Sequence, residues 1–189
     1  MSRATVLVVP GLRDAVDAHW QTLLESELAA LDRPVLAVPP MGRIGLGLDR
    51  KLEAIERAAQ EVAGPLVVVA HSGGCLMLAH WARRTTRAVQ GALLAAPPDF
   101  DATLPEGYPT LAALGAAGWL PVPRTPLPFP SIVAASRNDP LARFQRVAEL
   151  AEAWGSTLVD LGEVGHLNPA SGFGSWPRAH EFIDRLDAR

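Results

Sequence analysis

The hydrophobic and polar positions of this chain form two alternating patterns. Short apolar runs of strand length occupy residues 4–9, 35–38, 66–69, 91–96, 132–136 and 157–161. Apolar residues recur at helical spacing over residues 16–31, 48–62, 73–86, 140–154 and 176–186. Strands that alternate with helices usually pair in parallel, with helices on both faces of the sheet. The pattern therefore predicts an α/β fold, a three-layer sandwich around a six-stranded parallel sheet.

The alternation breaks between residues 97 and 130. This segment holds nine of the 17 prolines and only one short helical pattern, at residues 111–120. Long connections of this kind are usually lids or binding loops. A disordered linker is the alternative, but Tyr108, Trp119 and Phe129 are side chains that favour burial. We expect one domain over residues 1–189, with the proline-rich excursion (residues 97–130) covering the functional site.

Size, composition and charge exclude several classes of partner. A chain of 189 residues can bury roughly 70% of the surface that it exposes when unfolded. A net charge of −3 gives no electrostatic reason to bind nucleic acid or an anionic membrane. No apolar run approaches the 18 residues or so of a transmembrane helix. We expect neither partner, while a protein partner and the oligomeric state stay open.

The basic residues and the single cysteine indicate the kind of organism and the cellular compartment of the protein. Cys75 is the only cysteine, so no internal disulfide can form, which fits a reducing compartment. The apolar stretch near the N-terminus is too short for a secretion signal, and we interpret it as the first strand. Lys51 is the only lysine, as in proteins from GC-rich bacterial genomes. We expect a cytoplasmic bacterial protein.

Ser72 stands where a buried strand changes abruptly into a helix. The local sequence is Ala-His-Ser-Gly-Gly, so small residues flank the serine at Ala70 and Gly74. A nucleophile elbow has this layout, because a strained corner lifts the serine side chain clear of the sheet and needs small neighbours. A tight turn without chemistry is the alternative interpretation of the pentapeptide alone.

Candidate site residues also follow other predicted strands. Gly11 and Leu12 follow the first strand, Asp139 follows the fifth and His166 follows the sixth. Ligands of open α/β sheets bind outside the carboxyl ends of the strands. Nucleophile, acid and base therefore share one predicted edge, in the chain order Ser, Asp, His that hydrolases of this architecture use.

These motifs resemble those of the α/β-hydrolase superfamily. The Pro-Gly start, the His19-Trp20 pair, the Ser-Arg-Asn-Asp-Pro turn at 136–140 and the segment Gly-His-Leu-Asn-Pro-Ala-Ser-Gly-Phe-Gly-Ser-Trp-Pro at 165–177 are similar to one branch. That branch is the small serine hydrolases of the YdeN and retinoblastoma-binding protein 9 type. The resemblance implies a Ser-His-Asp hydrolase of small esters without a metal or organic cofactor. The Leu-x-Cys-x-Glu protein-binding motif of that family's namesake is absent around Cys75, so that partner is not carried over.

Each residue of the predicted site has a role in this interpretation. Ser72 is the nucleophile, His166 the general base and acid, and Asp139 the group that holds and stabilises the imidazole. The amides of Leu12 and Gly73 form the oxyanion hole.

Alternatives remain for the acid. Asp139 precedes Pro140 and is therefore also a good helix N-cap, a role that it can combine with catalysis. Asp99 and Asp101 follow the fourth strand, another position from which a carboxylate can reach the histidine.

The other histidines, the cysteine and two tryptophans receive lesser roles. His71 is interpreted as scaffold and Cys75 as a packed thiol. His19, His80 and His180 fit helical patterns and show no metal-ligand spacing. His19, Trp119 and Trp176 are candidate residues of the substrate pocket, although aromatic residues on helix faces are more often core.

Three functional hypotheses follow. The first is a serine hydrolase, a carboxylesterase that cleaves small esters through an acyl-enzyme on Ser72. The second keeps the same triad as an amidase, thioesterase or acyltransferase. The third is a non-catalytic protein-binding module on a hydrolase scaffold, a role that would place no demand on Ser72, Asp139 and His166 together. The first two take a small-molecule acyl substrate.

Overall fold

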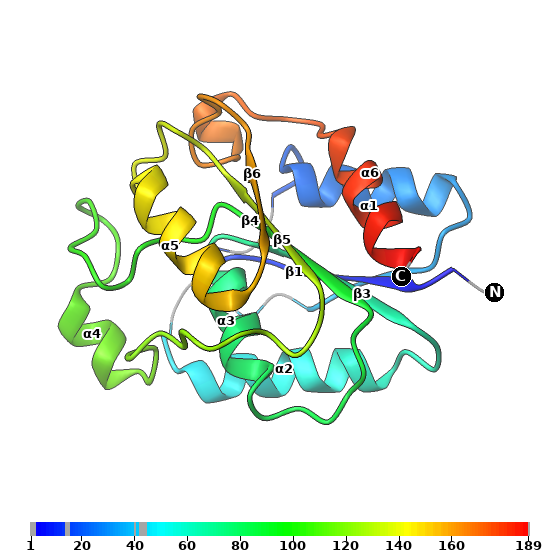
Figure 1. The fold of residues 1–189 in the computed structure, drawn as a ribbon, viewed down its shortest axis with the longest axis horizontal. Coiled ribbons are helices and arrows are strands. Elements are labelled where there is room, and N and C mark those ends of the chain that lie inside the picture. Colours follow the sequence, from blue (N-terminus) through cyan, green and yellow to red (C-terminus); the bar gives the residue numbers. More distant parts are fainter. Residues whose placement is uncertain (1–2, 14–15, 40, 42–44, 189) are drawn as a thin grey trace.

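Six parallel strands form the centre of the molecule (Figure 1). The computed structural model describes residues 3–13, 16–39, 41 and 45–188. The strands are β1 (Thr5–Val9), β2 (Val35–Ala37), β3 (Leu66–His71), β4 (Gly91–Ala95), β5 (Ser131–Ala135) and β6 (Thr157–Asp160). They lie in the order β2-β1-β3-β4-β5-β6, and every pair is parallel. The predicted six-stranded α/β fold is confirmed.

Helices cover both faces of this sheet (Figure 1). The helices are α1 (Trp20–Ala30), α2 (Leu48–Gln60), α3 (Gly73–Trp81), α4 (Leu111–Ala116), α5 (Phe144–Trp154) and α6 (Arg178–Asp187), with a 3₁₀ turn at Pro169–Ser171. One core cluster joins α1 and α6 to the sheet, and the other joins α2, α3 and α5 to the opposite face. The architecture is therefore a three-layer sandwich.

The central strand β3 explains why the apolar run of residues 66–69 is continuous rather than alternating. Successive side chains of a strand point to opposite faces. Val67 and Val69 belong to the cluster under α1 and α6, whereas Leu66 and Val68 belong to the cluster under α2, α3 and α5. Because both faces are covered, every residue of β3 is buried.

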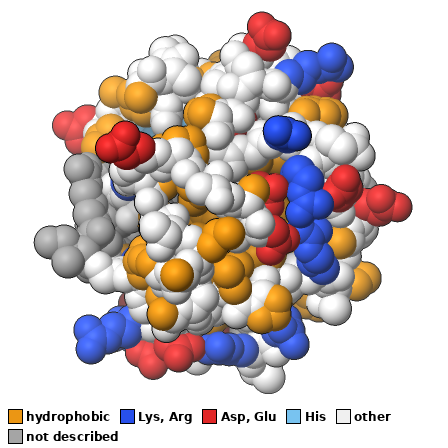
Figure 2. All heavy atoms as spheres, turned by 90° about the vertical axis from the view of Figure 1, so that its left-hand side faces the viewer, with side chains coloured by type: hydrophobic (Ala, Val, Ile, Leu, Met, Phe, Trp, Pro, Cys, Tyr) orange, Lys and Arg blue, Asp and Glu red, His pale blue; other side chains and the backbone are white. Residues whose placement is uncertain are grey.

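The proline-rich excursion packs against the domain instead of extending as a linker. It carries α4 and lies on the left of Figure 1. The indole of Trp119 is fully buried, and its Nε1 donates a hydrogen bond of 2.7 Å to the carbonyl of Leu46. Trp154 Nε1 on α5 donates to the carbonyl of Pro123 at 2.8 Å. Figure 2, which looks onto this side, shows hydrophobic side chains over the middle and a band of positively and negatively charged side chains to their right.

Several helix boundaries differ from the prediction, and each difference has a local cause. Helix α1 begins at Trp20 rather than near residue 16, because the His19 side chain caps it by accepting from Gln21 N at 3.2 Å. Helix α5 begins at Phe144 rather than at Pro140, because residues 139–143 form a turn that precedes it. Within the described residues, no helix is long and apolar enough to cross a membrane.

A close approach between α3 and β1 leads to a test of the fold. A Cβ added at Gly74 would lie 2.7 Å from the carbonyl oxygen of Pro10 and 2.8 Å from that of Val9. Because these are backbone atoms at the end of the buried strand β1, they cannot move aside cheaply, and overpacking of this kind costs about 1–3 kcal/mol. We expect Gly74→Ala to lower the free energy of unfolding by at least that amount in urea denaturation.

Gly64→Ala is the matched control, since a Cβ at Gly64 meets nothing within 4 Å. It should leave the unfolding free energy within about 0.5 kcal/mol of wild type. Equal stability of the two variants would contradict the packing argument.

Candidate active site

Ser72 occupies the sharp corner between β3 and α3. Its backbone has φ 54° and ψ −128°, a region that non-glycine residues rarely adopt. The corner is held by a hydrogen bond of 2.9 Å from Ser72 N to the carbonyl of Ala95. A Cβ at Gly11 would lie 3.1 Å from Ser72 Cβ, so only a glycine fits beside the serine without displacement. The geometry is that of the predicted elbow.

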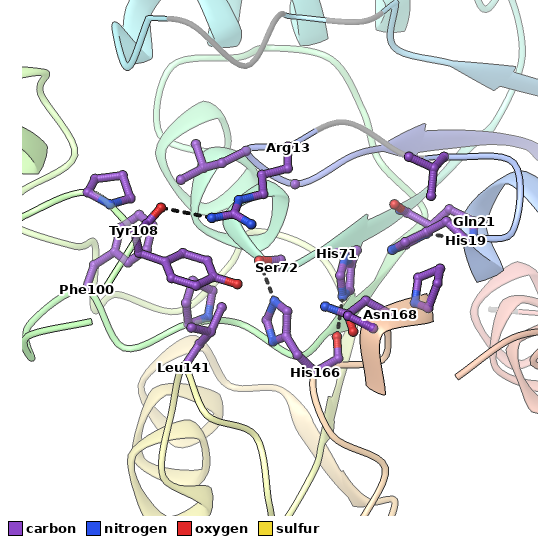
Figure 3. A pocket seen from close by; sticks show the side chains of 18 of the residues that line it. Arg13, His19, Gln21, His71, Ser72, Phe100, Tyr108, Leu141, His166 and Asn168 are labelled. Carbon is purple, nitrogen blue, oxygen red and sulfur yellow. Dashed lines mark hydrogen bonds between the residues drawn. The ribbon is translucent and has the colours of Figure 1, made fainter. Parts of the chain in front are cut away.

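The imidazole of His166 reaches this serine from the loop after β6. Its Nε2 lies 2.8 Å from Ser72 Oγ, within hydrogen-bond distance (Figure 3). The side chain is only 6% exposed, which limits the orientations that the ring can take. A serine hydroxyl beside an imidazole nitrogen is the arrangement that activates a nucleophile.

Asp139 holds the opposite side of the same ring. Its Oδ2 lies 2.8 Å from His166 Nδ1, and the carboxylate is 2% exposed. Its Oδ1 accepts a hydrogen bond of 2.8 Å from Leu141 N within a turn. The expected N-cap role is wrong, because α5 starts after Arg143. The carboxylate therefore orients the imidazole and stiffens the turn that follows β5.

The two alternative carboxylates are engaged elsewhere. Asp99 Oδ2 lies 3.1 Å from Arg146 Nε, and Asp101 Oδ2 lies 2.5 Å from Arg124 Nη2. Both form ion pairs with arginines of the excursion and α5. Of the three candidates, only Asp139 contacts the imidazole in this structure.

Gly73, which follows the serine in the chain, lies close to Leu12 of the loop after β1. A Cβ at Gly73 would lie 3.5 Å from Leu12 N and 3.0 Å from Leu12 Cγ. Among the hydrogen bonds between described residues, none uses either amide as a donor. Two amides without acceptors beside a nucleophile are suited to bind a developing oxyanion.

His71 positions the backbone of the His166 loop. It is the last residue of β3 and is buried, and its Nε2 donates a hydrogen bond of 2.9 Å to the carbonyl oxygen of His166. The two ring centroids are 5.0 Å apart. Burial, reinforced by the nearby His166 and His19, holds the pKa of His71 well below its ordinary value. His71 is therefore a neutral donor, a more specific role than the scaffold that the sequence suggested.

His19 extends this row of imidazoles. Its ring centroid lies 4.7 Å from that of His71, and its Nδ1 caps α1. Burial, with a smaller effect of His166, lowers the pKa of His19 to about 4. The ring lines the cavity described below, as expected from the sequence.

Asn138 ties the turn after β5 to the loop that carries His166. Its Oδ1 accepts hydrogen bonds from Gly165 N at 2.7 Å and from Ser136 Oγ at 2.9 Å. The same Ser136 Oγ accepts from Val164 N at 3.2 Å. Sequence reasoning missed this role, although Asn138 stands next to Asp139 in the motif.

A cavity of about 600 Å³ opens in front of Ser72 (Figure 3). The loop after β1, the excursion and the His166 loop build its walls. Its described lining residues are Gly11, Leu12, Arg13, Val16, His19, Gln21, Gly45, Leu46, His71, Ser72, Pro98, Phe100, Gly107, Tyr108, Pro109, Leu141, His166, Asn168, Pro169 and Ala170. The excursion thus borders the cavity.

Two expected pocket residues do not line this cavity. Trp119 lies behind the wall, where its indole packs on Phe100 with ring centroids 5.4 Å apart. Trp176 packs between α1 and α6, 4.9 Å from the ring of Trp20 and 5.8 Å from that of Phe182. Both expectations are corrected: these indoles are part of the hydrophobic core.

Neither a metal cluster nor a reactive thiol is present in the described part of the chain. No group of three or more His, Cys, Asp or Glu side chains there could hold a metal ion. The Sγ of Cys75 lies 3.4 Å from the carbonyl of Ala95, and burial raises the pKa of this thiol well above its ordinary value. Cys75 is a packed thiol rather than a nucleophile.

Comparison with known proteins points to hydrolases. A family model described as serine hydrolase matches residues 6–185. A solved structure from Pectobacterium atrosepticum, described as YdeN-like, is 31% identical, with a TM-score of 0.80 over 98% of this chain and 93% of its own. The ydeN gene product of Bacillus subtilis is 18% identical, with a TM-score of 0.75 over 98% of this chain and 100% of its own. No curated protein matches the sequence.

The neutral histidines predict how stability depends on pH. The pKa of His19 is about 4 in the folded protein against 6.5 ordinarily, so the unfolded chain binds the proton more readily. The contribution of His19 to the free energy of unfolding is therefore fully present above pH 6.5 and is lost as the pH drops from 6.5 towards 4. His71 contributes in the same direction. We expect urea unfolding to show a lower free energy at about pH 5 than at neutral pH.

His19→Asn separates titration from capping, because asparagine accepts the same helix-capping hydrogen bond but does not titrate. Its loss of stability on acidification should be smaller than that of wild type. Identical losses in the two proteins would contradict the assignment of His19.

Proposed function

The chain belongs to the serine hydrolase family, and from this premise we propose that it cleaves small carboxylic esters through an acyl-enzyme on Ser72. One observation carries the proposal: Ser72 Oγ, His166 and Asp139 are joined by two hydrogen bonds of 2.8 Å at the wall of a cavity. The strained backbone of Ser72 supports it, since such strain is commonly found at active sites.

Acylation starts with the removal of the serine proton. His166 Nε2 accepts the proton of Ser72 Oγ as the oxygen attacks the carbonyl carbon of the ester. Nδ1 must then carry the other ring proton, which it donates to Asp139 Oδ2. The carboxylate stabilises the imidazolium that forms, and transfer by a positioned base typically contributes about 10²- to 10⁴-fold.

The tetrahedral intermediate carries its negative charge on the former carbonyl oxygen. The free amides of Leu12 and Gly73 donate to this oxyanion, and loss of one such donor in a comparable hydrolase reduces turnover by about 10²- to 10³-fold. The imidazolium then protonates the alcohol oxygen, the ester bond breaks, and the acyl group remains on Ser72. A water molecule then attacks the acyl-enzyme with the same proton transfers, and the carboxylic acid is released from Ser72.

The hydrogen bond from His71 has a place in this cycle. The imidazole of His166 gains a positive charge in each half-reaction, while His71 stays uncharged because it is buried. A neutral His71 can hold the carbonyl of His166 without competing for the serine proton.

The same residues also serve other acyl transfers. An amidase or thioesterase differs in the leaving group, and an acyltransferase differs in the group that accepts the acyl chain from Ser72. A protein-binding module would not use Ser72, His166 or Asp139 for chemistry. The connected hydrogen bonds favour catalysis over the binding module, and the compact cavity favours small acyl groups.

Labelling with a fluorophosphonate tests the nucleophile. These probes react covalently with activated serines, so we expect one label per wild-type chain and none on Ser72→Ala, measured by intact-protein mass spectrometry. Circular dichroism of both proteins serves as the control for folding. A folded but unlabelled wild type would overturn the proposal and favour the binding module.

Substitution of the three carboxylates tests the acid. We expect Asp139→Asn to lower kcat for a para-nitrophenyl ester by about 10³- to 10⁴-fold, because the imidazole loses the carboxylate that stabilises its charged form. Asp99→Asn and Asp101→Asn are matched controls that break only ion pairs, and each should change kcat by less than about threefold. Full turnover in Asp139→Asn with loss in a control would refute the assignment.

A further inference from the structure

Arg13 is the one formally charged residue, apart from the histidines, among the described residues that line the cavity. It follows Leu12 in the loop after β1. Figure 3 shows Arg13 and Tyr108 on the side of the cavity opposite His19 and Gln21, with Ser72 between them. No aspartate or glutamate occurs among the described lining residues.

The guanidinium of Arg13 is held in place from the excursion. Its Nη2 donates a hydrogen bond of 2.9 Å to the carbonyl of Gly107. Its central carbon lies 4.5 Å from the centroid of the Tyr108 ring, a cation–π contact. A guanidinium has five N–H donors in a rigid fork. A contact to one carbonyl and one ring face therefore leaves other donors for a ligand.

The rest of the cavity wall favours recognition by this one charge. Leu12, Phe100 and Leu141 supply apolar surface beside the guanidinium of Arg13, which is itself exposed. The pKa values of His19 and His71 are lowered by burial, so both rings are uncharged at neutral pH. A cationic substrate would meet Arg13 without a carboxylate from the described wall to balance it.

We propose that the cavity selects esters with a carboxylate on the acyl or the alcohol part, and that Arg13 binds this carboxylate. The inference rests on the proposed function and names the substrate class of the same site. A carboxylate fits the guanidinium fork with two parallel hydrogen bonds and neutralises its single charge. A doubly charged phosphate would be balanced only in part by one arginine.

The test compares pairs of esters that carry either a carboxylate or a neutral carboxamide at the same position. For the acyl part, the para-nitrophenyl monoester of adipic acid is compared with that of adipamic acid. For the alcohol part, para-acetoxybenzoate is compared with para-acetoxybenzamide. In at least one pair, we expect wild type to prefer the carboxylate in kcat/KM by about 10- to 100-fold, the range of a charge-assisted hydrogen bond.

Arg13→Gln should reduce this preference to about one, and added salt should weaken it in wild type. Arg178→Gln is the matched control: Arg178 is also exposed and also lies over an aromatic ring, 5.2 Å from the centroid of Phe182, but it does not line the cavity. It should keep the wild-type preference. The ratio of kcat/KM cancels any change that affects both esters equally.

The outcomes separate this inference from the proposed function. If Arg13→Gln slows both esters of a pair equally, Arg13 only braces the excursion and the inference is overturned. The inference is also overturned if wild type cleaves the neutral esters and shows no preference for the charged ones. If wild type cleaves none of the esters and takes no fluorophosphonate label, the proposed function fails and the inference fails with it.

Discussion

The site depends on the forced backbone conformation of Ser72. A serine with a positive φ is unfavourable by itself and persists only where the surroundings determine it. Here the surroundings are two glycines: Gly74 lets α3 approach the end of β1, and Gly11 leaves space beside the serine. The amide of Ser72 is bound to Ala95 at the end of the next strand. The packing of strands and helix thus fixes the position of Oγ before any other residue of the site is considered.

The acid and the base come from two separate loops, after β5 and after β6, and hydrogen bonds hold them in place. Asp139 holds one nitrogen of the imidazole, His71 holds the backbone carbonyl of His166, and Asn138 holds the amide of Gly165. The ring of His166 is therefore restrained at its side chain and on both sides of its peptide backbone. Such restraint reduces the reorganisation that proton transfer requires.

The sequence was sufficient for the strands, their parallel pairing and the shared edge of Ser72, Asp139 and His166, because these follow from hydrophobic periodicity and the order of elements. It was insufficient where a contact joins distant segments. A tryptophan indicates burial but not which side of a cavity wall it occupies, which is why the sequence leaves Trp119 and Trp176 as candidates both for the pocket and for the core. Arg13 meets Gly107 and Tyr108 across more than ninety positions, and no local pattern predicts that meeting. The cap expected at Asp139 failed because the tertiary contact with His166 determines its turn.

The excursion contributes no strand to the sheet, yet it supplies a large part of the cavity wall through Pro98, Phe100, Tyr108 and Pro109. A large part of the cavity wall is therefore encoded in a different stretch of the gene from the strand and helix that hold Ser72. Insertions, deletions or exchanges within this stretch can redirect the enzyme to new compounds during evolution, while the scaffold that aligns the reacting atoms is inherited unchanged.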